Sequence, residues 1–397
     1  MSRFALPLAT LMIAGIVGPG STAAQGLAWT ALPDMPIGKW EAATAVIDGK
    51  IYLFGGYIQN VRSSKRSDIF DPNEGSWTQF QDMPSAVSHM NAVLDGRTVW
   101  FAGGFKDGYR GHAIAEVWNY DVDEDRYTAA PLLPETRGGG GLALVGRNLH
   151  FIGGLEADRD TDSADHWVLD LEAWRRLGGG SVQWQNAAPM PTPRNQFSTV
   201  TVDGRIYAIG GQFHHDSEQL DQARVDIYDP ATDSWASGPP LPKGHSHAEG
   251  GTFVHDGRIY MVGGHTTPEG GTKSIDPDIL ALTPGGAWEL VGRLPVPLSS
   301  PAAAIIDGKL YVAGGWAGAW GLPPRDHVCD ELFAYDRQSE YWEVVSRMYI
   351  ARRYNGIAAL DGRVWVIGGE NRIVERGGEG QVLYTVDIYD PASATWS

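Results

Sequence analysis

Short apolar runs, separated by polar turn residues, recur along most of the chain. A typical run, residues 51–54, follows an Asp-Gly pair and ends at a Gly-Gly pair. Runs rich in Val, Ile, Tyr and Trp on both sides of a tight Asp-Gly turn predict a β-hairpin. The pattern therefore predicts a chain of short antiparallel strands.

The turn, the apolar strand and the Gly-Gly pair form a unit that recurs every 48 to 57 residues. The copies are 48–56, 95–104, 146–154, 203–211, 256–264, 307–315 and 361–369. A third run follows each unit and ends in a turn, and a fourth run then starts at a Trp or Tyr and stops before a Pro. Four strands per repeat, in seven repeats, predict the blades of a β-propeller. The longest step, in the third repeat, contains an insertion at 175–181.

The Gly-Gly pair, the Tyr-Asp-Pro-like turn and the Trp at a fixed distance after it resemble the kelch repeat. The resemblance covers essentially the whole chain after residue 24. It implies an all-β fold, a seven-bladed kelch-type β-propeller with four antiparallel strands per blade. Glycines lack Cβ, so the pairs are expected where strands approach closely near the axis, with Trp and Tyr rings between the blades.

One strand start is surplus to the seven repeats. Trp29 has the pattern of a fourth-strand start, whereas Trp396 has a single residue after it. We therefore expect residues 27–33 to supply the outer strand of the last blade, beside 386–389, so that an N-terminal strand closes the ring. A disulfide cannot do so, because Cys329 is the only cysteine.

Residues 1–24 have the pattern of a secretory signal peptide: Arg3, an apolar run at 4–17, and small residues up to Ala24. A membrane anchor is the alternative, although the run is shorter than the roughly 20 residues that span a bilayer. We expect residues 25–397 to form one propeller domain, monomeric, in the periplasm or outside the cell, with no membrane insertion after cleavage.

The chain after residue 24 is strongly acidic. It has 30 basic and 48 acidic side chains, a net charge of −18. Such a chain repels phosphate backbones and anionic lipid surfaces. Nucleic acid is therefore excluded as a partner.

The propeller topology places the connections on two faces. The Asp-Gly hairpins and the Asp-Pro-type turns lie on one face, called here the hairpin face. The segments after each Gly-Gly pair, and those leading into the next first strand, vary widely and lie on the opposite, loop face. Variable loops on a rigid scaffold commonly carry binding sites, so a ligand is expected there and at the channel mouth.

Basic residues recur nine positions before the Asp-Gly turn. The residues at this position, with Gly146 as the reference in the third blade, are Lys39, Ala86, Arg137, Arg194, His247, Leu298 and Arg352. One interpretation is a cationic collar that binds a carboxylate or another small anion. The alternative is a common kelch feature, in which the side chains bond loop carbonyls and balance nearby acids. The residues two positions later point to the same side of a strand as the basic residues. They are Glu41, Ser88, Gly139, Gln196, Glu249, Ser300 and Tyr354.

Histidines and aromatic residues supply further candidates. His245, His247 and Glu249 alternate along one strand, and His214, His215 and His265 lie in nearby loops. Imidazoles at a rim could hold zinc or copper, but exported proteins also carry histidines without a metal, and we expect no cofactor. Trp316, Trp320, Tyr109 and Phe105 could stack on a sugar or pack on one another.

Two functions fit these features. The first is a binding module for a carbohydrate or a protein, a frequent role of kelch propellers, with candidate contacts Lys39, Arg137, Arg194, His247, Arg352 and Trp316. The second is a carbohydrate-processing enzyme that resembles the periplasmic kelch mutarotase of sialic acid, although that family has six blades. One acid and one base across a sugar ring suffice for anomer interconversion, and the candidates are Glu41, Glu249, Arg194 and Arg352. A copper oxidase like galactose oxidase is disfavoured, because Cys329 lacks a recognisable Tyr-His context.

Overall fold

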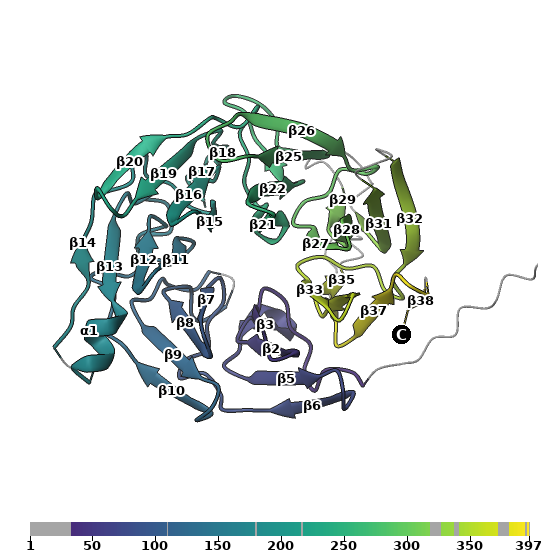
Figure 1. The fold of residues 1–397 in the computed structure, drawn as a ribbon, viewed down its shortest axis with the longest axis horizontal. Coiled ribbons are helices and arrows are strands. Elements are labelled where there is room, and N and C mark those ends of the chain that lie inside the picture. The colour runs from purple at the N-terminus through teal and green to yellow at the C-terminus, as the bar shows by residue number, and fades with distance from the viewer. Residues whose placement is uncertain are drawn as a thin grey trace, which may run out of the picture.

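The strands form a ring of four-stranded antiparallel sheets around a central channel, as Figure 1 shows. This computed structural model describes residues 33–108, 110–178, 181–215, 217–317, 327–336, 341–371, 381–393 and 395–396. The four-stranded sheets in the described part of the chain number seven, so the predicted seven-bladed propeller with four antiparallel strands per blade is confirmed. Within the described residues, no helix is both long and apolar enough to span a bilayer.

Each blade runs from an innermost strand beside the channel to an outermost strand. Blade one consists of β1 (Ala43–Ile47), β2 (Lys50–Phe54), β5 (Ser67–Asp71) and β6 (Ser76–Gln79). Blade two consists of β7 (Asn91–Asp95), β8 (Thr98–Ala102), β9 (Val117–Asp121) and β10 (Arg126–Ala129). Blade three consists of β11 (Gly141–Val145), β12 (Asn148–Ile152), β13 (His166–Asp170) and β14 (Gln185–Asn186). Blade four consists of β15 (Ser198–Val202), β16 (Arg205–Ile209), β19 (Val225–Asp229) and β20 (Ser234–Ser237).

The remaining blades repeat this order. Blade five consists of β21 (Thr252–His255), β22 (Arg258–Val262), β25 (Asp278–Leu282) and β26 (Trp288–Arg293). Blade six consists of β27 (Ala302–Ile306), β28 (Lys309–Ala313), β31 (Glu331–Asp336) and β32 (Tyr341–Arg347). Blade seven consists of β33 (Gly356–Leu360), β34 (Arg363–Ile367), β37 (Val386–Asp390) and β38 (Thr395–Trp396).

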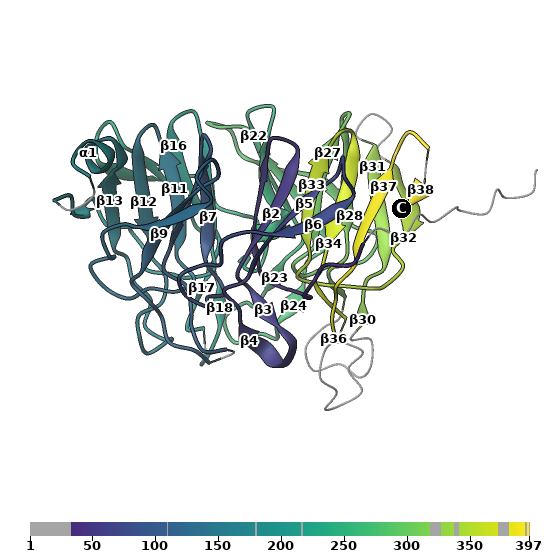
Figure 2. The same ribbon diagram turned by 90° about the horizontal axis from the view of Figure 1, so that it is seen from below.

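Small elements extend the loop face, the lower side in Figure 2. Two-stranded ribbons form there from β3 (Tyr57–Ile58) and β4 (Arg62–Ser63), β17 (Gln212–Phe213) and β18 (Leu220–Asp221), β23 (His265–Thr266) and β24 (Ser274–Ile275), β29 (Trp316–Ala317) and β30 (His327–Val328), and β35 (Glu370–Asn371) and β36 (Gln381–Val382). Two 3₁₀ turns are η1 (Gln59–Val61) and η2 (Glu249–Gly251). A short helix, α1 (Leu171–Arg176), lies on the hairpin face at the start of the insertion in blade three. Asp170 caps this helix by accepting a hydrogen bond from the Ala173 backbone N–H.

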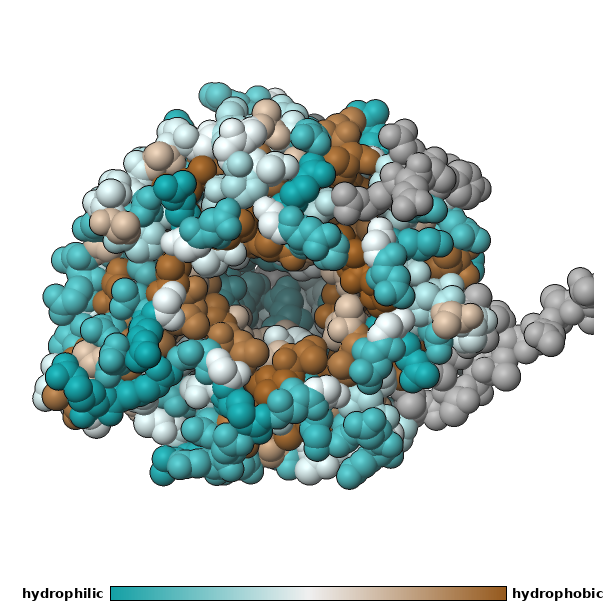
Figure 3. All heavy atoms as spheres, viewed as in Figure 1, coloured by the Kyte–Doolittle hydropathy of each residue, from teal (hydrophilic) through white to brown (hydrophobic). Residues whose placement is uncertain are grey.

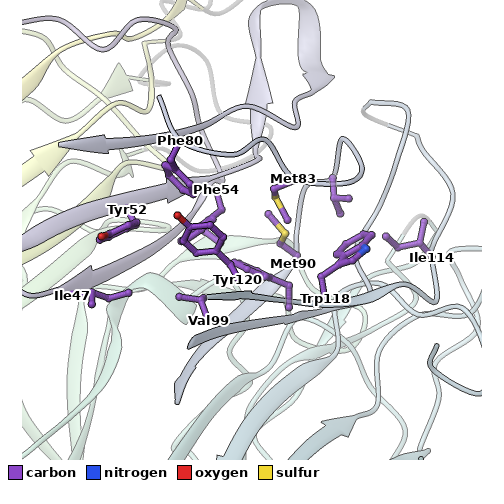
Figure 4. Packing of buried hydrophobic residues seen from close by; sticks show 13 residues of the cluster. Ile47, Tyr52, Phe54, Phe80, Met83, Met90, Val99, Ile114, Trp118 and Tyr120 are labelled. Carbon is purple, nitrogen blue, oxygen red and sulfur yellow. The ribbon is translucent and has the colours of Figure 1, made fainter. Parts of the chain in front are cut away.

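The hydrophobic core is divided into wedges between neighbouring blades. Figure 4 shows the wedge between blades one and two, where Tyr52 and Phe54 pack against Tyr120, while Trp118 of the same cluster lies beside Ile114. Fourth-strand tryptophans also tie blades together, because the Trp235 indole N–H donates to the Ala188 carbonyl at 2.7 Å. The expectation that aromatic rings fill the wedges is confirmed.

The second glycine of every Gly-Gly pair links its blade to the next one. Each glycine N–H donates to the carbonyl of the residue that enters the following blade, over 2.7 to 3.0 Å. The acceptors, in ring order, are Val87, Arg137, Arg194, His245, Leu298, Arg352 and Lys39. Gly369 of blade seven donates to Lys39 of blade one, so the same bond joins the two ends of the ring.

Blade seven also packs on the segment that precedes blade one. The Met35 N–H donates to the Tyr384 carbonyl at 2.6 Å, and the Met35 side chain is buried beside Val386 and Ile388. The C-terminal β38 pairs with β37 over two residues. Residues 27–32, expected to complete this outer strand, lie outside the described residues, so closure by an N-terminal strand stays a prediction.

Candidate functional site

The basic residues of the repeat are buried inside the blades. Lys39, Arg137, Arg194 and Arg352 are each at most 3% exposed. Arg194 Nη1 lies 2.7 Å from Asp226 Oδ2, and its other nitrogens donate to the carbonyls of Gly210 and Ala208.

Three other blades, one, three and seven, repeat this ion pair. Lys39 pairs with Asp68, Arg137 with Asp165, and Arg352 with Asp387. These pairs link the entry of a blade to its third strand. The open cationic collar expected from the sequence is therefore corrected: the side chains bond carbonyls and balance acids, as the alternative held, because the strand turns them into the blade. Their predicted contact with a ligand has no support from this geometry.

In each blade, the residue two positions after the entry residue lines the channel mouth on the loop face. These residues are Glu41, His89, Gly139, Gln196, His247, Ser300 and Tyr354, called here the mouth ring. All are partly exposed, and all have φ between 47° and 63°. A left-handed backbone strains every residue except glycine, and such strain tends to persist at functional sites. Six of the seven positions nevertheless keep a side chain.

The sequence alignment missed two members of the mouth ring. In blade two, Gly96 occupies the first turn position and Asp95 ends β7, so the ring residue is His89 and not Ser88. In blade five, η2 adds residues before β21, so His247 lies in the ring, His245 takes the buried entry position, and Glu249 is exposed at the start of η2. The recurring Ser-His pairs at 88–89 and 246–247 were the available signal.

Glu41 and His89 form a contact across the seam between blades one and two. Glu41 Oε2 lies 3.1 Å from His89 Nε2. Burial raises the pKa of Glu41 to about 8, and the negative charges of Glu370 and Glu249 act in the same direction. Burial lowers the pKa of His89 to about 3, helped by nearby positive charge. At neutral pH the Glu41 carboxyl group therefore keeps its proton and the His89 ring is neutral, with His89 Nδ1 lying 3.2 Å from Ser88 Oγ.

An aromatic group lies on one side of the mouth. The Arg353 guanidinium lies 5.3 Å from the ring of Trp316 and 4.8 Å from that of Tyr354. Its Nε donates to Glu370 Oε1 at 2.8 Å, which fixes its plane. The Tyr354 ring is 5.5 Å from that of Trp40, which adjoins Glu41. Trp316 and Tyr354 are partly exposed, so their edges remain accessible to a ligand.

Amide and imidazole groups lie on the other side. Gln196 donates its backbone N–H to Gly139 at 2.9 Å, and its side chain is partly exposed. The His247 Nδ1 atom lies 2.8 Å from Ser246 Oγ, and its ring packs 4.6 Å from that of His265. Burial lowers the pKa of His247 well below its usual value, so the ring is neutral. The mouth therefore offers neutral donors and acceptors opposite aromatic surfaces.

The histidines considered as metal ligands do not converge. His245 is buried and its Nε2 lies 2.8 Å from Asp276 Oδ2, whereas His247 belongs to the mouth ring and His265 Nε2 lies 2.5 Å from Ser299 Oγ. Among the described residues, no group of three His, Cys, Asp or Glu side chains is arranged to hold a metal ion. His214 is exposed in the loop after β17.

The other aromatic candidates differ in position. Phe105 is buried, and the Arg159 guanidinium covers its ring at 4.1 Å. Trp316 lies at the mouth, whereas Tyr109 and Trp320 fall outside the described residues. Cys329 is buried, and burial raises the pKa of its thiol to about 12, so it is not a reactive thiolate.

Comparison with known proteins agrees with this architecture. The Kelch motif model matches residues 41–84, 193–242, 297–349 and 351–397. The solved structure titled "Structure of YjhT" superimposes with a TM-score of 0.58 at 13% identity, covering 93% of this chain and 99% of that one. The chain is therefore a kelch-repeat propeller, and this fold supports a ligand-binding role.

Curated relatives share the repeat at low identity. The chain is 23% identical over 313 residues to Kelch repeat-containing protein At3g27220 of Arabidopsis thaliana, covering 74% of this chain and 72% of that protein. It is 28% identical over 261 residues to Kelch-like protein terF of Aspergillus terreus and 25% over 295 residues to human Kelch-like protein 23. The alignments cover 64% and 73% of this chain, but only 54% and 46% of those two proteins.

Proposed function

We propose that this propeller binds a carbohydrate at the mouth ring on its loop face. The observation that carries the proposal is the combination of partly exposed Trp316 and Tyr354 rings with Glu41, Gln196 and His247 around one opening. Aromatic rings pack against the apolar face of a sugar, and planar polar groups bond its hydroxyls. The strained backbone of the mouth ring supports a role for these side chains beyond folding.

Isothermal titration of residues 25–397 with neutral sugars, uronic acids and sialic acid tests this proposal. A sugar that binds should lose about tenfold or more in affinity in Trp316→Ala or Gln196→Gly, since each variant removes a contact worth about 1.4 kcal/mol or more. Tyr349→Ala, at a tyrosine that is 78% exposed and outside the mouth ring, is the matched control. If no sugar in the panel binds, or the control loses as much affinity, the carbohydrate proposal is wrong and a protein ligand takes its place.

One specific contact favours anomer interconversion of a bound sugar as a second candidate. His89, a neutral base, lies beside Glu41, whose carboxyl group keeps its proton near neutral pH. Such a pair can remove the proton from an anomeric hydroxyl while protonating the ring oxygen. The ring C–O bond then breaks and re-forms on the other face. In this role His89 replaces the earlier candidates Arg194 and Arg352, which are held in buried ion pairs.

Exchange spectroscopy by NMR on the two anomers of the bound sugar measures this activity directly. Wild-type protein should speed the exchange, and Glu41→Gln should reduce the acceleration by about a hundredfold or more, the usual contribution of general acid–base catalysis. Tight binding without any acceleration of exchange would leave a binding protein and exclude the enzyme.

The proposal also includes export. Residues 1–24 have the signal-peptide pattern but lie outside the described residues. N-terminal sequencing of protein recovered from a secreting host should begin at Gln25. Recovery of the intact N-terminus from the cytoplasm would contradict export.

A further inference from the structure

The channel opens on the hairpin face through a ring of apolar side chains. The ring is formed by the penultimate residue of each innermost strand. In every blade this residue pairs with the second residue of the next strand. Its members, all apolar except Thr201, are called here the apolar ring: Val46, Leu94, Leu144, Thr201, Val254, Ile305 and Ala359. Val46, Leu94 and Val254 are 38%, 43% and 39% exposed.

These side chains make one patch around the opening. Figure 3 shows the hairpin face, with hydrophobic residues around the central hollow and hydrophilic residues deeper inside it. Soluble proteins rarely leave grouped aliphatic side chains exposed at an opening unless a partner covers them. The two ends of the channel therefore differ, with polar groups at the loop face and aliphatic groups at the hairpin face.

Carboxylates stand outside the apolar ring on consecutive blades. Asp203, Asp256, Asp307 and Asp361 occupy the hairpin turns of blades four to seven and are exposed. In blades four, five and seven the basic residue that follows the turn is engaged farther out along the blade: Arg205 pairs with Asp229, Arg258 with Glu289, and Arg363 with Asp390. In blade six the exposed Lys309 follows the turn, so the four carboxylates exceed the one remaining basic side chain. The inner carboxylates therefore give this rim a negative potential.

We propose that the hairpin face binds a cationic peptide segment that inserts an aliphatic side chain into the apolar ring. The aliphatic side chain would be withdrawn from water by the ring, while flanking Lys or Arg residues would meet the turn carboxylates. An acidic peptide or an anionic lipid surface is repelled by the same carboxylates and by the net charge of −17. This second site lies on the face opposite the mouth ring and is independent of the carbohydrate proposal.

Fluorescence anisotropy with a labelled hexapeptide, Lys-Lys-Leu-Leu-Lys-Lys, tests the site at low and moderate salt. The double variant Leu94→Asn/Val254→Asn should bind it about tenfold more weakly, since it removes the apolar contact. The matched control is Leu132→Asn/Leu290→Asn, at leucines 60% and 51% exposed outside the apolar ring, and should bind as wild type does. Asp307→Asn/Asp361→Asn should weaken binding and reduce its salt dependence.

A second peptide separates a built site from general attraction to an acidic protein. Lys-Lys-Gly-Gly-Lys-Lys should bind at least about tenfold more weakly than the leucine peptide. Equal binding of the two peptides, equal loss in the apolar-ring and control variants, or no binding of either peptide would each overturn the proposal. Thermal unfolding of each variant serves as the folding control, and a variant that unfolds at the same temperature as the wild type reports on binding alone.

Discussion

At the scale of single residues, the buried basic side chains hold the entry of a blade to its third strand. Arg194 is fully buried, pairs with Asp226, and donates to the backbone carbonyls of Gly210 and Ala208. A charge in such a place is costly without its counter-charge. The same ion pair in blades one, three, four and seven supports a structural role for these side chains.

Arg194→Met should lower the free energy of unfolding by about 3–5 kcal/mol, because Asp226 is left buried and uncompensated. The double variant Arg194→Met/Asp226→Leu should recover much of that loss. Urea denaturation measures both. The exposed pair of Arg205 with Asp229 is the control, and Arg205→Met should cost less than about 1 kcal/mol. Equal losses at the two sites would contradict the role given to burial.

A buried histidine pair gives the fold a dependence on pH. His150 Nδ1 lies 2.9 Å from His166 Nε2 in the wedge beside Tyr228. Burial lowers the pKa of His150 to about 3 and that of His166 to about 4. In the unfolded chain both titrate near pH 6.5, so unfolding takes up protons below that pH.

The contribution of this pair to stability should therefore be full above about pH 6.5 and fall as the pH drops toward 4. Each histidine contributes on the order of 2 kcal/mol of this loss between pH 7 and pH 5. Urea denaturation across this range should give a shallower pH dependence for His150→Phe than for wild type. His112→Phe should leave it unchanged, because the His112 side chain is 62% exposed in the folded protein. Parallel curves for the wild type and His150→Phe would refute this account.

At the scale of elements, the two kinds of glycine in a hairpin have different reasons to be glycine. Gly204 in the turn has φ of +73° and open space where a Cβ would point. Gly211 has φ of +93°, and a Cβ there would lie 2.7 Å from the Asn195 carbonyl oxygen. The turn needs only a left-handed backbone, whereas the Gly-Gly pair also needs room for the neighbouring strand.

Alanine substitution separates these two requirements. Gly204→Ala should cost about 1 kcal/mol, the price of a left-handed backbone. Gly211→Ala should cost at least about twice as much, because the inner strand must also move away. Thermal unfolding of the two variants, made in the same blade, compares them directly. A smaller loss for Gly211→Ala would show that the close contact relaxes freely.

The elements themselves were predictable because the repeat contains its own turn and spacing signals. Asp-Gly turns and Gly-Gly pairs fix where the hairpins lie, and both depend on backbone conformations that few residues other than glycine adopt. The direction of a side chain near the axis was not predictable, since Arg194 can reach the channel or the blade interior from the same strand position. The predicted positions of the mouth-ring residues were wrong in blades two and five, at Gly96 and η2, for a related reason. A one- or two-residue change of spacing moves a different side chain into the mouth ring without altering the repeat.

At the scale of the whole molecule, the disc separates its possible tasks by face. The loop face carries the mouth ring, with strained backbone, aromatic edges and neutral polar groups. The hairpin face carries the apolar ring and its acidic rim, and Figure 3 shows the hydrophobic residues around the opening on this face. Between the two faces, buried ion pairs and hydrophobic wedges hold the blades together, and these contacts belong to neither binding site. Substitutions on one face should therefore leave binding at the other unchanged, which titration of both ligands in the same variants would check.

The ring of glycine bonds makes the seam between blades seven and one chemically equivalent to every other junction. Gly369 donates to Lys39 at 2.9 Å, just as Gly211 donates to His245 at 2.7 Å. The folded ring should therefore depend little on which junction between blades carries the two ends of the chain. A circular permutant that is opened at the exposed turn between β19 and β20, beside Ala231 and Thr232, with its original ends tethered by a flexible linker, should assemble the same ring and retain both binding faces.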